Sequence, residues 1–422
     1  SSFEIMSFVT PYGIGLDFGA SGKTWIFDVT DFTPILKGNK RLFMSRGGEW
    51  QEEMDIKFMF IKGTPARNIL DIAQIWPTAI YQPNYSQILE NKVYFPPVNY
   101  PLNTIGKGFK IRSAITGHGG EGEFIPREHS IAVASKIYKS TVWKKCGNNP
   151  VFPQGGTWIY DRAGWCPGMA TDINEYDITA QCIGQSSVAL DYQINDGSGD
   201  SRYIVNNQLV TYGAYNFSND AAITEVISPS KRPEYAKINP ICVSPQIRIK
   251  NTGSSVLRLV EIDYWVNDKN NKKTQTWYGE LQPNAETIFP FDVNQSVWST
   301  AYKVNSLFYA SIVKVNGVAD EYAGNNTVSS EFDIPEVLPN HLIVFIRTNG
   351  AGAETSVSIV DDWGGKVYER TNMSSYTFYR DTVKLGLGCH TLSFKDSDND
   401  GIDFWANSDG SGFARILTVG GG

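Results

Sequence analysis

The sequence predicts an all-β protein made of several domains, and three observations support this fold class. Short β-branched runs alternate with turn residues, and no apolar stripe at the helical spacing lasts for a full helix. Aromatic residues make up 13% of the chain, which also has 39 glycines and 20 prolines. Its 422 residues exceed what one ordinary core can organise, so about two to four domains are expected.

Turns and proline-containing linkers divide the chain into four predicted units. Residues 1–66 contain too few strands to close a sandwich, so a partial first unit is expected. Residues 67–226 have the strand number and spacing of an antiparallel jelly roll, and the run from Ala221 to Ile227 is its last predicted strand. Residues 237–335 resemble the immunoglobulin-like modules of bacterial exported proteins, and residues 340–422 resemble small β-sandwiches appended to secreted bacterial enzymes.

Charge and hydropathy exclude two classes of partner. The net charge is -7 and the pI is near 5.3, so the chain offers no basic stripe for nucleic acid. No apolar run reaches the roughly 18 residues that a membrane-spanning helix needs. The first residues have no charged and apolar leader pattern, so a targeting peptide is expected to be absent or already removed.

The five cysteines suggest a compartment. None forms a C-x-x-C pair and only four histidines are present, so a Cys/His zinc site is not expected. Cys146 and Cys166 enclose one loop and could close it as a disulfide, or they could be two buried free thiols. A disulfide would suit a protein that is secreted, periplasmic or on the surface of a bacterial cell.

The loop that contains these cysteines, residues 146–169, is rich in glycine, proline and tryptophan and has no periodic pattern. A long loop inside a compact domain usually has a function, so we expect it to form the wall of a binding site. Its distinctive side chains are Trp158, the adjacent Asp161 and Arg162, and Trp165. A local Asp-Arg contact beside a core tryptophan is the structural alternative.

Two glycine-flanked acidic segments are candidates for acid–base chemistry. Glycines surround Glu121 and precede Glu123, and two glycines precede Glu49, which is followed by Trp50. Glycine lets a substrate approach the backbone, and a carboxylate placed there could act as a general acid or base. A solvated hairpin tip would explain the same composition.

Several of these motifs occur together in the order found in one known family. The loop 149–169, the Phe-Val-Thr-Pro-Tyr-Gly segment at residues 8–13, residues 28–32, the Glu49-Trp50 pair and residues 63–65 resemble the peptide N-glycosidase F family. The resemblance covers roughly residues 3–226. It implies two adjacent antiparallel jelly rolls, the first incomplete here, followed by the two smaller sandwiches. It also implies a site between the jelly rolls that hydrolyses the amide joining an N-glycan to asparagine.

The resemblance implies a role for each matching residue. Glu49 and Glu123 would be catalytic acids, Arg162 would orient a carboxylate, and Trp165 would stack on sugar. No cofactor is expected for catalysis, and the partner would be an N-glycosylated protein or peptide. The substrate-contacting residues would be Trp50, His118, Phe124, Trp158, Asp161, Arg162 and Trp165.

This sequence departs from the family pattern at three places. Glu121 and Ile125 replace cysteines beside the second glutamate, and His118 replaces a tryptophan. The family's principal catalytic aspartate lies in a segment upstream of Phe8 that is not in this sequence. Either an N-terminal piece of the same protein supplies that acid, or the chain binds glycan better than it hydrolyses it. A non-catalytic glycan-binding or cell-surface protein is the alternative function.

A separate motif near the C-terminus indicates a cation. Asp396, Asp398 and Asp400 precede Gly401 with the spacing that gathers carboxylates around calcium. Asn407 occupies the position where a bidentate glutamate is usual. The sequence therefore allows a structural calcium ion or an Asx-rich surface turn. Copper-dependent twin jelly-roll enzymes are a remote alternative, because the four histidines are scattered.

Overall fold

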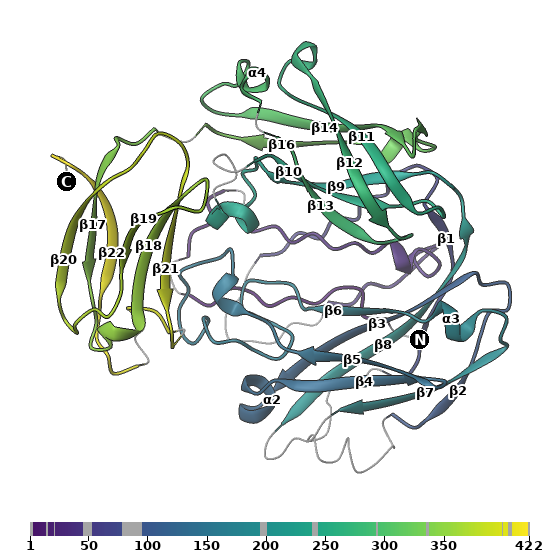
Figure 1. The fold of residues 1–422 in the computed structure, drawn as a ribbon. Helices are drawn as coiled ribbons and strands as arrows, with labels where there is room; N and C mark the ends of the chain where they lie inside the picture. Colours follow the sequence, from purple (N-terminus) through teal and green to yellow (C-terminus); the bar gives the residue numbers. More distant parts are fainter. Residues whose placement is uncertain are drawn as a thin grey trace.

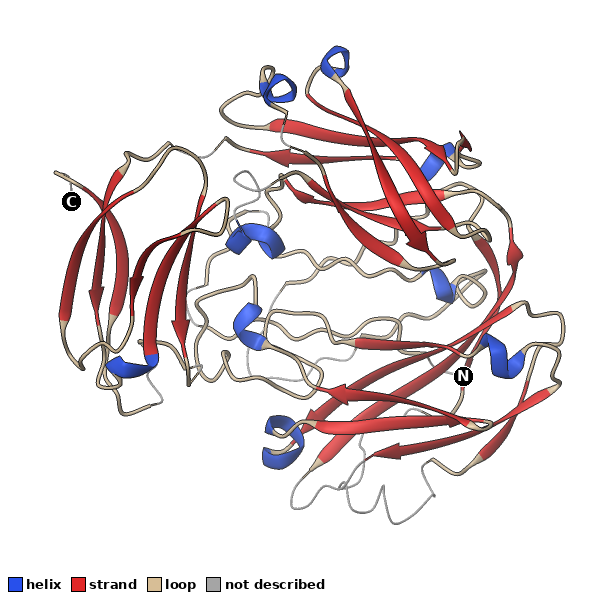
Figure 2. Cartoon of the chain, in the orientation of Figure 1, coloured by secondary structure: helices blue, strands red, loops and turns tan. Residues whose placement is uncertain are grey.

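A computed structural model describes residues 3–13, 16–20, 22–44, 53–77, 95–194, 201–238, 244–292, 294–334, 337–398, 400–403 and 407–420 (Figure 1). These residues are mostly β, as predicted, and form six antiparallel sheets with only short helical turns between them (Figure 2). No helix in the described part of the chain is long and apolar enough to cross a membrane.

Two four-stranded sheets share the core of the second unit. One has the order β1-β8-β3-β6 and the other β2-β7-β4-β5. Burial alternates along β7, as expected for a strand with one face on the core. Ile111, Ile131, Leu190 and Tyr203 are buried in this core. The strands are β1 (Arg67–Gln74), β2 (Val98–Pro101), β3 (Gly108–His118), β4 (Arg127–Val133), β5 (Lys136–Val142), β6 (Ile173–Asp177), β7 (Ser187–Ile194) and β8 (Arg202–Tyr215).

The third unit consists of a three-stranded sheet, β13-β10-β9, and a five-stranded sheet in which β16 also pairs with β14. Ile247, Ile262 and Phe308 are fully buried in its core. The strands are β9 (Ala221–Ser228), β10 (Gln246–Asn251), β11 (Leu257–Val266), β12 (Lys273–Leu281), β13 (Glu286–Pro290), β14 (Ser306–Val315), β15 (Val318–Ala319) and β16 (Thr327–Phe332).

Strand β9 corrects the predicted membership of one strand. The sequence placed Ala221 to Ile227 in the second unit, but β9 pairs with β10, and its Ile223 and Val226 belong to the core of the third unit. Alternating apolar residues predict a strand but do not say which sheet it joins. The chain changes sheets in the short turn after β8.

The fourth unit is a sandwich of two three-stranded sheets, with the orders β20-β17-β22 and β19-β18-β21. Val344 and Ile346 of the first sheet and Val357 and Ile359 of the second lie in one core. Figure 1 shows the sheet with β17, β20 and β22 on the outer side of the molecule. The strands are β17 (His341–Arg347), β18 (Thr355–Asp361), β19 (Lys366–Arg370), β20 (Phe378–Lys384), β21 (His390–Asp396) and β22 (Phe413–Thr418).

The described residues of the N-terminal region, between residues 3 and 62, form no named strand. Phe32, in the short helical turn η1 (Thr30–Phe32), packs against Ile72 and Val210. Residues 53–61 alternate in sequence as a half-buried strand would, but they form no strand, and Met59 is 84% exposed. Alternation in sequence produces alternating burial only where a strand has a sheet to join.

The short helical segments complete the described elements. Three are α-helical: α2 (Gly120–Phe124), α3 (Thr179–Cys182) and α4 (Gln295–Trp298). The remaining 3-10 turns are η2 (Cys146–Asn148), η3 (Pro233–Ile238), η4 (Lys269–Asn271), η5 (Ala323–Asn325) and η6 (Gly352–Glu354). Of these, α2, η2 and η6 position the candidate sites.

Candidate active site

The loop that was predicted to form a site wall connects β5 to β6, which are edge strands of the two sheets in the second unit. Cys146 and Cys166 close it as a disulfide with a Cα–Cα distance of 5.5 Å, so the predicted pairing is confirmed. Asp161 stabilises the start of the loop, because its Oδ1 accepts from the Cys146 backbone N–H at 2.9 Å and its Oδ2 lies 2.7 Å from Lys145 Nζ. Asp161 is thus engaged within the loop itself.

Arg162 is the centre of the loop and is only 1% exposed. Its Nε donates to Glu123 Oε1 at 2.8 Å. Its Nη1 donates to the Tyr160 carbonyl at 2.6 Å, and its Nη2 donates to the carbonyl and hydroxyl of Thr157 at 2.7 and 2.8 Å. A buried guanidinium needs such partners to offset its desolvation. It therefore fixes both the loop and the carboxylate of Glu123.

Glu123 comes from α2, which folds back over the end of β3. A Cβ on Gly117 would lie 2.0 Å from the Gly122 carbonyl, so this approach requires glycine. The Ala163 N–H donates to the Glu123 carbonyl at 2.9 Å and ties α2 to the loop. The Glu123 side chain is 19% exposed, so solvent reaches a carboxylate whose Oε1 is held from behind by Arg162.

Trp165 lies inside this arrangement rather than on its surface. It is 6% exposed, and its Nε1 donates to the Gly117 carbonyl at 2.9 Å. Its ring stacks on His118 at 5.9 Å, with the Arg162 guanidinium 5.0 Å from its centroid. Both neighbours leave little of the indole face for the expected sugar contact. Burial lowers the pKa of His118, and the charge of Arg202 adds to this, so neutral imidazole is favoured.

Two other residues contribute exposed aromatic rings near Arg162. Phe124 is 39% and Tyr160 is 37% exposed, and their rings meet edge to face at 6.3 Å. The Arg162 guanidinium lies 5.1 Å from the Phe124 ring, so this pair borders the Arg162–Glu123 ion pair. Trp158 is half-buried. The sequence reasoning selected Phe124 and Trp158 but missed Tyr160, although it lies within the aromatic loop.

The N-terminal segment runs along the loop and explains why their motifs occur together. Phe8 forms a β-bridge with Ala170, and the Gly168 N–H donates to the Val9 carbonyl at 2.8 Å. Tyr12 follows, with its ring centroid 5.8 Å from the Arg162 guanidinium. Burial raises the pKa of the Tyr12 phenol. Tyr12 was also missed as a site residue, although its motif was recognised.

Glu49 and Trp50, the other predicted catalytic acid and its aromatic neighbour, lie outside the described residues. The structure therefore places Glu123, Arg162, His118, Phe124 and the loop tryptophans, but not this second acid.

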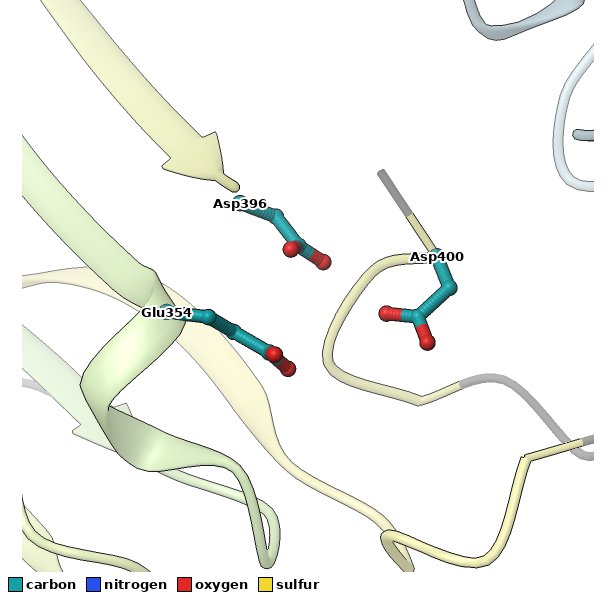
Figure 3. Close-up of side chains that lie close together, drawn as sticks. All are labelled: Glu354, Asp396 and Asp400. Atoms are coloured by element: carbon teal, nitrogen blue, oxygen red, sulfur yellow. The ribbon is translucent and has the colours of Figure 1, made fainter. Parts of the chain in front are cut away.

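The C-terminal acidic motif forms a separate cluster in the fourth unit. Asp396 and Asp400 approach Glu354, and one oxygen from each lies within 4.8 Å of the others (Figure 3). The Asp398 N–H donates to Asp396 Oδ1 at 2.9 Å, and Asn407 donates to Asp400 Oδ2 at 2.8 Å. Carboxylates gathered in this way could hold a hard divalent cation.

Glu354 is the member of this cluster that the sequence did not reveal. It ends η6, directly before β18, and no spacing rule connects it to the aspartates after β21. Burial raises its pKa, and the nearby Asp396 and Asp400 raise it further. The register of β18 with β21, in which Thr355 faces Asp396, brings Glu354 to the motif.

Comparison with known proteins covers the region that contains this loop. Residues 84–212 match the family model described as Peptide-N-glycosidase F, C terminal. A curated relative from Elizabethkingia miricola, peptide-N(4)-(N-acetyl-β-D-glucosaminyl)asparagine amidase F, is 27% identical over 232 residues. The match covers 49% of this chain and 64% of the relative, so the chain spans less than two thirds of that protein.

Two solved structures are also similar to part of the chain. PNGase F from Flavobacterium meningosepticum, described as a glycosylasparaginase, is 24% identical, with a TM-score of 0.28 over 36% of this chain and 55% of that chain. PNGF-II is 22% identical, with a TM-score of 0.28 over 34% and 30%. The family model and the curated relative carry the similarity: residues 84–212, which include Glu123 and Arg162, match the peptide-N-glycosidase F family.

Proposed function

We propose that this protein is an amidohydrolase that releases N-linked glycans from asparagine in glycoproteins or glycopeptides and converts the asparagine to aspartate. The observation that carries the proposal is the ion pair between the buried Arg162 and the partly exposed Glu123, at 2.8 Å. Kinship with an asparagine amidase supports the reaction type.

The geometry of Glu123 suits a positioning or base role. Amide hydrolysis needs a water molecule held near the carbonyl carbon and a route for its proton. Arg162 donates to Oε1 of Glu123, so Oε2 can accept a hydrogen bond from water or from the substrate amide. Glu49 is the second proposed catalytic acid. The proposed chemistry requires no metal or organic cofactor.

The aromatic surface suits the sugar part of the substrate. Phe124 and Tyr160 offer exposed rings beside Glu123, and the half-buried Trp158 lies in the same loop. Aromatic faces and polar tips suit ligands that have both apolar and polar surface, as sugars do. We therefore assign sugar contact mainly to Phe124 and Tyr160 rather than to the buried Trp165.

The proposed place of action is outside the cytoplasm of a bacterium, in the periplasm, at the cell surface or in the medium. The Cys146–Cys166 disulfide supports this, because disulfides persist in oxidising compartments. N-glycosylated proteins, the proposed substrates, would be met there.

A release assay tests the proposal. The protein is incubated with a denatured N-glycoprotein, and mass spectrometry follows the free glycan and the conversion of asparagine to aspartate in the peptide. We expect Glu123→Gln to lower the rate about 10²–10⁴-fold, the usual contribution of a positioned acid or base. Glu128→Gln is the matched control, because Glu128 pairs with Lys139 on the surface at 2.9 Å. Unchanged release by Glu123→Gln would remove Glu123 from the mechanism.

A glycan-binding protein without turnover is the second candidate, and the exposed Phe124–Tyr160 pair favours it as much as it favours the enzyme. Binding of glycopeptide with no release of glycan by the parent protein would decide for this alternative.

A further inference from the structure

The outward face of the sheet β20-β17-β22 has an alternating pattern of aromatic and cationic side chains. Phe345 lies opposite Arg380 on one neighbouring strand and Arg415 on the other. Opposed residues, and residues two apart along a strand, share one face of a sheet. The register therefore builds one surface, the Phe/Arg face, from Phe345, Arg347, Phe378, Arg380, Phe413 and Arg415.

This face is turned away from the core of the fourth unit. Val344 and Ile346, which alternate with Phe345, are buried against the other sheet. Figure 1 shows this sheet at the outer side of the molecule, and Phe378 is 60% exposed. The Phe/Arg face is thus open to a ligand.

The six side chains form a continuous surface. The Phe345 ring lies 6.1 Å from that of Phe378 and 5.1 Å from that of Phe413. Arg347 lies over Phe378 at 5.5 Å, and Arg415 lies over Phe413 at 4.8 Å. The aromatic rings hold the guanidinium groups along the sheet without neutralising their charge.

None of these three arginines makes an ion pair or a side-chain hydrogen bond within the described part of the chain. The other outward positions on β17 and β20 are His341, the buried Ile343, Thr382 and Lys384, and none of them is an acid. The third unit differs, because its exposed Arg258 is paired with Glu280. Residues 340–422 contain ten acidic and seven basic residues, so this cationic face stands out from an acidic domain.

We propose that the Phe/Arg face binds the carboxylate-bearing sugars at the ends of N-linked glycans. The guanidinium fork matches a planar carboxylate, and the phenyl rings suit the apolar faces of sugar rings. The net charge of -7 repels a long phosphate backbone beyond this patch, which disfavours nucleic acid. The choice of N-glycans as the source rests on the proposed function, whereas the binding itself does not require hydrolysis.

Binding of a free oligosaccharide tests the proposal with the whole protein. The probe is a sialylated biantennary N-glycan without its asparagine, compared by titration with the same glycan after removal of sialic acid. We expect the sialylated form to bind about tenfold more tightly, and added salt to remove this preference. Arg380→Gln and Arg415→Gln should each weaken binding of the sialylated glycan about tenfold. Lys366→Gln, which removes a surface lysine paired with Glu369, is the control and should change nothing.

Three results would overturn the proposal: equal affinity for both glycans, unchanged binding by the folded arginine variants, or tighter binding of a sulfated polysaccharide or single-stranded DNA. Failure of hydrolysis is scored separately by glycan release from a glycoprotein. A chain that binds the sialylated glycan through Arg380 but releases none would refute the proposed reaction and leave this inference standing.

Discussion

Arg162 and the arginines of the Phe/Arg face have similar aromatic neighbours but differ in burial and in their ion pairs. The Arg162 guanidinium lies 5.0 Å from Trp165, and that of Arg415 lies 4.8 Å from Phe413. Arg162 is 1% exposed and its donors bind Glu123 and loop carbonyls, whereas Arg415 is exposed and makes no ion pair with another described residue. The comparison shows that a matched, buried charge fixes structure, while an unmatched, exposed charge remains available for a ligand.

Replacing Arg162 should have the largest effect. Arg162→Gln leaves the carbonyls of Thr157 and Tyr160 without their donors and leaves Glu123 without its counter-charge, so we expect a loss of about 3–5 kcal/mol in unfolding free energy. Urea unfolding followed by tryptophan fluorescence measures this. Arg258→Gln, which removes an exposed partner of Glu280, should cost less than about 1 kcal/mol. Equal losses in the two variants would contradict the comparison.

Removing the disulfide should have the next largest effect. The bond joins residues 20 apart, and a closed loop of this size contributes about 3 kcal/mol by restricting the unfolded chain. We expect Cys146→Ser with Cys166→Ser to lower the thermal midpoint and to reduce glycan release, because the loop that carries Arg162 loses its closure. A double variant that unfolds like the parent would show that the contacts of Arg162 alone order the loop.

The acidic cluster in the fourth unit is the reverse case, because it brings three carboxylates together. We expect calcium at a hundred times its dissociation constant to raise the stability of this unit by about 2.7 kcal/mol. Glu354→Gln and Asp400→Asn should weaken the response, whereas Glu369→Gln, at a surface ion pair, should retain it. A thermal midpoint that is the same in calcium and in chelator would leave an Asx-rich turn as the explanation.

The same cluster should make the stability of the fourth unit depend on pH, and the raised pKa of Glu354 determines the direction of the change. Glu354 has a raised pKa in the folded state, chiefly through burial and then through Asp396 and Asp400. The folded state therefore binds the proton more tightly than the unfolded state, so in chelator the fourth unit should lose stability as pH rises through that pKa. Calcium should reverse this trend, because it binds the ionised carboxylates. Glu354→Gln should flatten the profile, and an unchanged profile would assign the pH dependence to other groups.

The sequence predicted those features well that depend only on composition or on residues close together in the chain. The β-rich composition led to the fold class, and two cysteines enclosing one loop led to the disulfide. Arg162 and Glu123 were both selected as site residues, although their ion pair joins α2 to a loop 39 residues later. The resemblance to a family, not spacing, linked those two residues.

Features that depend on sheet register could not be predicted in this way. Glu354 joins the aspartates only because β18 pairs with β21, and β9 joins the third unit only through its pairing with β10. Trp165 was expected to face sugar, but sequence alone does not reveal that Gly117 accepts its N–H and that His118 covers its ring. The Phe/Arg face likewise exists only in the register of three strands.

Arg380→Gln should have the smallest effect on stability, and it distinguishes the exposed arginines of the Phe/Arg face most clearly from the buried Arg162. Arg380→Gln removes a cation that has no paired carboxylate in the described part of the chain, and loses only its contact with Phe345, whose centroid lies 5.9 Å away. Such a substitution at an exposed position should change the unfolding free energy by less than about 0.5 kcal/mol. The same variant should lose about tenfold in affinity for the sialylated glycan. If Arg380→Gln lost as much unfolding free energy as Arg162→Gln, Arg380 would be structural. A loss of glycan binding that came only from unfolding of the variant would contradict a ligand role for Arg380.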